Sequence, residues 1–132
     1  MGKFKRKFRI QPQERYILWE LEEAGEDSLT GLLNALHCDE FPDIGGEPFL
    51  RTAEVALKTL LRGGLIQLAR TEVGPPPSSV PYSREESLQL LNLTSNLSWV
   101  DSALVWTWSD AAPVVALPYV ILTDDGREFL AR

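Results

Sequence analysis

The chain has 132 residues, of which 44% are hydrophobic and 24% are charged, and its formal net charge is −6. This length and composition predict a globular protein with one domain and a core of its own. A single cysteine excludes an internal disulfide framework, and no apolar run approaches the ~20 residues that a membrane helix needs. The basic N-terminus is not followed by the apolar stretch of a signal peptide, so we expect a cytoplasmic protein without membrane contact.

The charge is unevenly distributed along the chain. Five cations precede residue 10, so the remaining residues carry a net charge of −11, five units more negative than the whole chain. Such an acidic body repels nucleic-acid backbones at long range. We interpret residues 1–11 as a basic arm that contacts phosphate or an acidic partner surface, or as a solvated terminus. Its cations are Lys3, Lys5, Arg6, Lys7 and Arg9.

Two helices come next in the chain. Apolar residues at three- and four-residue spacing predict a first helix over residues 12–24, which Gly25 ends. Ser28 is the expected N-cap of a second helix, whose leucines follow the same spacing. His37 and Cys38, near its end, are the one histidine and the one cysteine of the chain. Two adjacent residues cannot supply the ligands that zinc requires, so we expect neither a metal site nor catalysis there.

Residues 39–47 predict a long loop with four carboxylates and two adjacent glycines. The spacing of the carboxylates does not match a calcium-binding EF-hand loop. We interpret this loop as either solvated or in contact with a basic partner surface. The contact residues in the second case are Asp39, Glu40 and Asp43.

Residues 49–62 predict the central helix of the protein. Alanines and leucines form an apolar stripe on one side of it, and cations lie on the other. Gly63-Gly64 ends this helix, because glycine accepts the left-handed conformation of a helix C-cap. A short strand is expected over residues 65–70.

The next forty residues predict an irregular segment. Residues 72–82 are rich in proline and cannot continue a central strand, so they indicate an extended linker. Ser83 and Glu86 form a capping box, which predicts a short helix through Leu91.

Three of the four tryptophans fall within ten residues of this segment. Residues 103–108 predict a strand in which Leu104, Trp106 and Trp108 share one face, and Trp99 lies just before it. No Lys or Arg occurs between residues 84 and 127, so stacking on nucleic-acid bases is disfavoured. The tryptophans are expected either to pack in a local core or to contact a protein partner.

The end of the chain predicts strand segments over residues 114–117 and 119–122, on either side of Pro118. Thr123 is the expected N-cap of a last helix. The acidic pair Asp124-Asp125 then lies in its first turn, where the helix dipole favours negative charge.

Two of these stretches resemble bacterial winged helix-turn-helix regulators of the MarR type. The first is the helix–glycine–strand junction over residues 60–66, and the second is the strand followed by Leu-Thr, two residues, Gly126 and a helix. The resemblance implies an α+β fold, a winged helix with a three-helix core and a small antiparallel sheet, over residues 12–132. Residues 73–112 then form an insertion that enlarges the wing. The residues of the recognition helix would be Arg51, Thr52, Val55, Lys58 and Arg62.

Two functions remain open for such a protein. The first is non-catalytic binding of a protein partner, as an adaptor, antitoxin or immunity-like protein. Its contacts would be Asp39, Glu40, Asp43, Trp99, Trp106 and Trp108. The second is transcriptional regulation, with the helix over residues 49–62 in the major groove of duplex DNA.

No phosphate-binding loop, nucleophile motif or metal-ligand spacing occurs in the sequence, so we expect no enzyme and no cofactor. The last helix is short and offers little surface for dimerisation. This favours a monomer or a complex with a partner, whereas a regulator that reads paired half-sites would form a homodimer.

Overall fold

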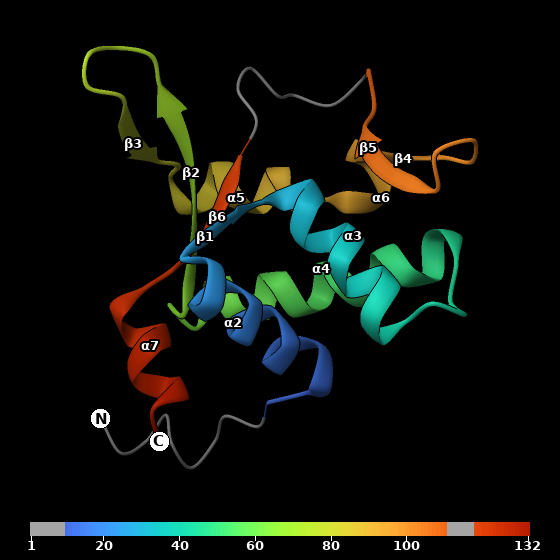
Figure 1. Cartoon of the computed structure of the whole chain (residues 1–132), viewed down its shortest axis with the longest axis horizontal. Coiled ribbons are helices and arrows are strands. Elements are labelled where there is room, and N and C mark those ends of the chain that lie inside the picture. The colour runs from blue at the N-terminus through green and yellow to red at the C-terminus, as the bar shows by residue number, and fades with distance from the viewer. Residues whose placement is uncertain (1–9, 111–117) are drawn as a thin grey trace.

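The computed structural model describes residues 10–110 and 118–132. These residues form an α+β fold, in which helices pack against a four-stranded antiparallel sheet and a separate two-stranded hairpin (Figure 1). The five cations predicted for the basic arm and the strand predicted over residues 114–117 lie outside the described residues.

The first three helices are α2 (Pro12–Ala24), α3 (Leu29–Glu40) and α4 (Gly46–Arg62). The start and end predicted for α2 are confirmed, and Gly25 follows it with a φ of 85° that glycine adopts without strain. Ser28 caps α3 as predicted, because its hydroxyl accepts the amide of Gly31 at 3.1 Å.

The connection from α3 to α4 is shorter than the sequence predicts. Asp39 and Glu40 belong to the last turn of α3, and Glu47 belongs to the first turn of α4. The loop predicted over residues 39–47 is therefore wrong, since only residues 41–45 lie outside the helices. An acidic residue in the first turn of α4 is favoured by the helix dipole, which explains why the helix begins earlier than its apolar stripe.

The main sheet has the strand order β1-β6-β2-β3, and all its pairs are antiparallel. Its strands are β1 (Glu26–Ser28), β2 (Ile66–Glu72), β3 (Ser78–Pro81) and β6 (Tyr119–Leu122). The strand nearest the end of the chain thus lies between two earlier strands, with Val120 opposite both Asp27 and Leu68.

The segment between β2 and β6 contains β3 and four further elements. They are α5 (Arg84–Leu90), α6 (Leu93–Asn96), β4 (Leu97–Val100) and β5 (Val105–Trp108). The capping box of Ser83 and Glu86 is confirmed at the start of α5. The placement of Leu104 on a strand is wrong, because this residue has a φ of 56° in the β4–β5 turn and is 66% exposed.

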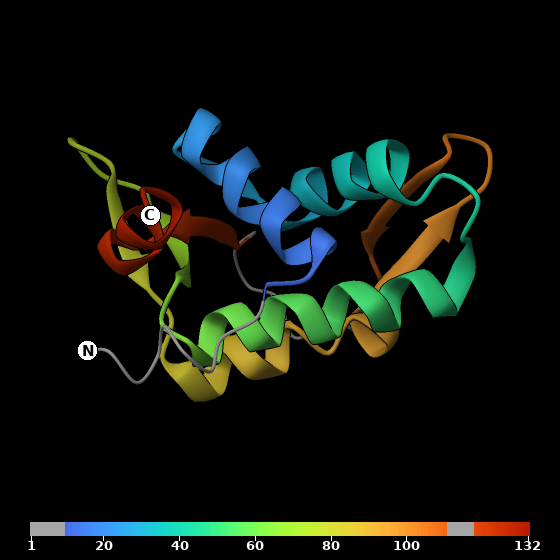
Figure 2. The same cartoon turned by 90° about the horizontal axis from the view of Figure 1, so that it is seen from below.

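The core is organised around α4, which lies between α2 on one side and α5 and α6 on the other (Figure 2). Each large apolar side chain that it buries contributes about 1.5–3 kcal/mol. The buried residues of α4 are Phe49, Leu50, Ala53, Ala56, Leu57, Leu60 and Leu61.

The two stretches that carry the resemblance contact each other in the fold. The hydroxyl of Thr123 donates to the carbonyl of Gly64 at 2.6 Å and accepts the amide of Gly126 at 3.0 Å. The amide of Thr123 donates to the carbonyl of Leu65 at 3.1 Å. The start of α7 (Asp124–Leu130) is thereby fixed to the junction between α4 and β2. The winged-helix interpretation itself stays a prediction.

Gly126→Ala is expected to lower the free energy of unfolding by about 1–3 kcal/mol, the usual cost of overpacking. A Cβ at this position would come within 3.0 Å of both the carbonyl oxygen of Leu65 and the side chain of Leu122. Urea denaturation followed by tryptophan fluorescence measures the change.

Gly63→Ala is the matched control at the same junction. Gly63 has helical backbone angles, and an added Cβ would meet only ordinary contacts of 3.4 Å or more. This variant should be neutral or more stable by about 0.4–1 kcal/mol. Equal stability of the two variants would contradict the packing of α7 described above.

Candidate functional site

The residues predicted for DNA recognition lie on the polar side of α4, but only some of them are open to solvent. Arg51, Val55 and Arg62 are exposed. The charge of Arg51 is paired with Glu47, one turn earlier. The hydroxyl of Thr52 donates back to the carbonyl of Pro48 at 3.1 Å.

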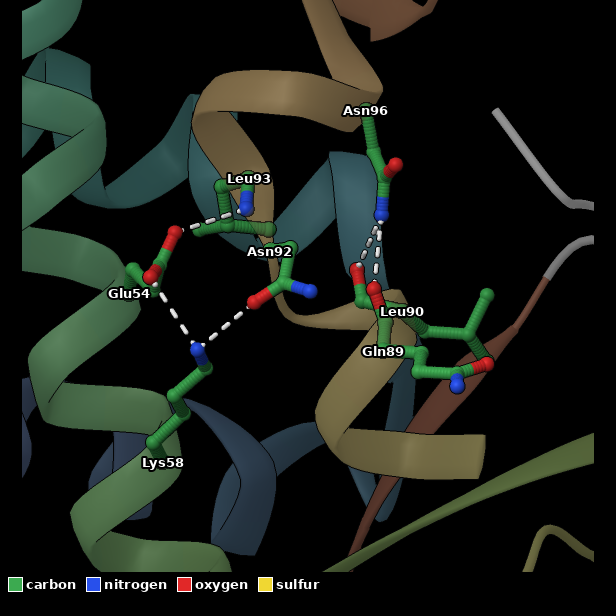
Figure 3. A network of polar contacts seen from close by, with 7 residues as sticks. All are labelled: Glu54, Lys58, Gln89, Leu90, Asn92, Leu93 and Asn96. Atoms are coloured by element: carbon green, nitrogen blue, oxygen red, sulfur yellow. Dashed lines mark hydrogen bonds and ion pairs between the residues drawn. The ribbon is translucent and has the colours of Figure 1, made fainter. Parts of the chain in front are cut away.

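Lys58 and its neighbour Glu54 attach α6 to the middle of this side (Figure 3). One carboxylate oxygen of Glu54 accepts the backbone amide of Leu93 at 2.8 Å, and the other lies 3.1 Å from the ammonium of Lys58. The same ammonium donates to the side-chain oxygen of Asn92 at 2.7 Å. The side chains of Lys58 and Glu54 are only 19% and 23% exposed, so the predicted recognition surface is covered at its centre.

A buried side chain fixes α6 in turn to the end of α5 (Figure 3). The amide of Asn96, which is 5% exposed, donates to the carbonyls of Gln89 at 2.9 Å and Leu90 at 3.1 Å. Buried polar groups stabilise a fold when they are paired in this way. The contact between α6 and α4 is thus supported from both sides.

The tryptophans predicted to contact a partner belong to an aromatic cluster at the far end of α4. Trp106 is 4% exposed, and its ring stacks 6.1 Å from the ring of Phe49. The ring of Trp99 contacts Trp106 edge-on at 5.1 Å. The prediction that Trp106 contacts a partner is therefore corrected, since this residue is part of the core; Trp99 and Trp108 are half-buried against it.

His37 joins this cluster to the loop between α3 and α4. Its ring stacks on Phe49 at 4.3 Å. The indole N–H of Trp106 points at Nδ1 of His37 at 3.3 Å, while Nε2 lies 2.7 Å from the carbonyl of Ile44. This pattern assigns the proton to Nε2, because Nδ1 must accept from the indole. His37 therefore links α3, the aromatic cluster and the loop before α4.

Asn34 is a site residue that sequence reasoning missed. Its side chain accepts the amide of Trp106 at 2.8 Å and donates to the carbonyl of the same residue at 3.2 Å. It takes the place of a neighbouring strand at the open edge of β5 and holds the hairpin on α3. A lone amide among the leucines of the helix was the available signal, because such a group needs a partner when it is covered.

The last turn of α3, the loop after it and the β4–β5 turn all lie at one end of the molecule (Figures 1 and 2). Two exposed apolar side chains occur here, Ile44 at 39% and Leu104 at 66%. Four exposed carboxylates lie on the same three segments. We call the following exposed residues the end surface: Asp39, Glu40, Asp43, Ile44, Asp101 and Leu104.

Carboxylates also gather between α2 and α3. The hydroxyl of Tyr16 donates to Asp39 at 2.6 Å, and burial together with this bond raises the pKa of Tyr16 well above its ordinary value. Burial raises the pKa of Glu20 as well, and the charges of Glu23, Asp27 and Asp39 add to this effect. The negative charge on this side of the molecule is thus held at a cost to stability.

Within residues 10–110 and 118–132, no group of three or more His, Cys, Asp or Glu side chains is arranged to hold a metal ion. No helix of these residues is long and apolar enough to cross a membrane. Comparison with protein-family models, with curated proteins and with solved structures finds no significant match to the chain.

Glu20→Gln is expected to raise the free energy of unfolding at pH 7. The pKa of Glu20 is raised in the folded state, so its contribution to stability is complete below the ordinary value of 4.5 and is lost as the pH rises through the raised pKa. Urea denaturation at pH 7 and at about pH 4 measures this dependence, and the gain should shrink at the lower pH.

Glu22→Gln makes the same chemical change at an exposed position of α2 and serves as the control. An equal gain from the two variants would mean that net charge, rather than the surroundings of Glu20, sets the effect.

Proposed function

We propose that the chain is a non-catalytic, winged-helix-like binding protein that engages a protein partner in the cytoplasm, as an adaptor, antitoxin or immunity-like protein. The order of elements supports the winged-helix part of this proposal. A helix, a short strand, two helices and a strand are followed, after the inserted segment, by a strand and a last helix. The returning strand β6 pairs between β1 and β2, as the strand after a wing is expected to do.

The attachment of α6 to α4 is the observation that carries the choice of a protein partner over DNA. A recognition helix has to enter the major groove with its polar side free. Here Glu54 and Lys58, at the centre of that side, bind Asn92 and Leu93 of the inserted segment. The acidic body of the chain opposes phosphate in addition.

The end surface has the properties of a protein contact. Exposed Ile44 and Leu104 provide apolar area, and exposed carboxylates lie on the same segments of the chain. The cluster of His37, Phe49 and Trp106 holds this area in place, which lowers the entropy lost when a partner binds.

DNA binding remains a second candidate because part of the polar side of α4 is open. Arg62 is exposed and has no ion-pair partner among the described residues, and Val55 is 62% exposed. Together with the cations before residue 10, Arg62 could contact phosphate without entry of the helix into the groove.

Affinity capture from cell extract with Leu104→Asn tests the proposal. Asn tolerates the left-handed backbone at this position, so the variant should fold while it removes apolar area from the end surface. We expect the wild-type chain to retain a protein that the variant loses. Val73→Asn is the matched control, since Val73 is fully exposed on the β2–β3 hairpin, and it should capture the same protein as the wild type.

Fluorescence anisotropy with mixed duplex DNA across a salt series is the second arm of this test. We expect no micromolar binding by the wild-type chain. A different result would contradict the proposal: micromolar or tighter binding that weakens steeply with salt and is lost in both Arg51→Glu and Arg62→Glu. The chain would then be a DNA-binding transcriptional regulator. If Leu104→Asn and Val73→Asn capture the same protein equally well, the end surface is not the contact with the partner.

A further inference from the structure

The outward face of α2 is not covered by any described part of the chain. Trp19, at its centre, is 55% exposed. The guanidinium of Arg15 lies 5.6 Å from the centre of this indole ring, a geometry in which a cation is attracted to the ring. Figure 2 shows α2 and α3 along one side of the molecule, away from α5 and α6.

Negative charge around Trp19 is offset only in part, by Arg15. Arg15 is the only Lys or Arg between residues 10 and 50. We call the following residues of α2, β1 and α3 the α2–α3 face: Trp19, Glu20, Glu23, Asp27, Asp39 and Glu40. None of its five carboxylates forms an ion pair with a described residue. Five carboxylates elsewhere do so, namely Glu47, Glu54, Glu72, Asp124 and Glu128.

These carboxylates lie close enough to act on one another. The charges of Glu23, Asp27 and Asp39 all raise the pKa of Glu20, and those of Asp39 and Glu40 raise the pKa of Tyr16. A cation bound here would relieve this repulsion. The carboxylates are spread over α2, β1 and α3, so a ligand that matches them carries several positive charges spread along its length.

We propose that the α2–α3 face binds a Lys/Arg-rich segment of another polypeptide. The carboxylates supply charge complementarity along α2 and α3. The ring of Trp19, which Arg15 of the same helix already contacts, is still 55% exposed and supplies a surface for a further cationic side chain. The α2–α3 face shares Asp39 and Glu40 with the end surface. It goes beyond the proposed function because the apolar side chains of the end surface, Ile44 and Leu104, take no part in it.

The test measures the Kd of a short fluorescent oligo-lysine peptide for the full chain by anisotropy. Glu23→Gln/Glu40→Gln should raise this Kd about three- to ten-fold, since two contacts to cations are lost. Glu85→Gln/Asp110→Asn makes the same change in net charge at exposed positions outside the face, and it should change the Kd less than about two-fold. Equal weakening by the two double variants would overturn the proposal.

Trp19→Ala separates the face from the general charge of the protein. This variant leaves the net charge unchanged and should raise the Kd about two- to five-fold, the value of an exposed cation–ring contact. Leu104→Asn should leave the Kd unchanged, whether or not the end surface has a partner. No effect of Trp19→Ala would overturn the proposal.

The chain's own cations before residue 10 are the competing occupant. A full-length variant in which Lys3, Lys5, Arg6, Lys7 and Arg9 are replaced by Gln tests them. Unchanged peptide affinity supports binding of another polypeptide. If this variant binds the peptide more tightly than the wild type, and the gain disappears when Glu23→Gln/Glu40→Gln is added, the chain's own N-terminal residues occupy the face. This result would overturn the proposal.

Discussion

The carboxylate of Glu54 joins two parts of the molecule that lie 39 residues apart in the sequence. It binds the backbone amide of Leu93 and the ammonium of Lys58, and the side chains of Glu54 and Lys58 are only 23% and 19% exposed. Breaking such a contact on one side leaves a covered polar group without a partner, which costs about 1–3 kcal/mol. Because of this contact, α4 is packed on its polar side as well as on its apolar side. The central helix thus supports the inserted segment as well as the core.

The inserted segment is held by polar side chains from two different helices. Glu54 of α4 holds α6, and Asn34 of α3 holds β5 by both backbone groups of Trp106. Between these points the aromatic cluster around Phe49 fills the space. The result is a fixed β4–β5 hairpin whose turn is presented to solvent with Leu104 exposed. The negative charge of the chain is concentrated on other elements. These are α2, β1 and α3, where Arg15 is the only Lys or Arg.

Local signals in the sequence predicted the elements that local chemistry determines. Ser28, Ser83 and Thr123 cap the helices as their hydroxyls indicated, and the leucine spacing of α2 and α3 gave the buried sides of these helices. The partners of Asn34 and Glu54 were not predictable in this way, because Asn34 and Trp106 are 72 residues apart. For the same reason the sequence left Trp106 open between core and surface. The length of the α3–α4 loop was misjudged because acidic residues suit both a loop and the first turn of a helix.

Amide hydrogen exchange at Leu93 tests the contact between α6 and α4 most directly. The account predicts that this amide is protected in the wild-type chain and that Glu54→Gln, which weakens its acceptor, lowers the protection about ten-fold. Glu47→Gln, on the same helix but paired only with Arg51, should leave Leu93 unchanged. Exchange of the Leu93 amide in the wild-type chain at the rate of a solvent-exposed loop would show that α4 is open on its polar side, and would contradict the account.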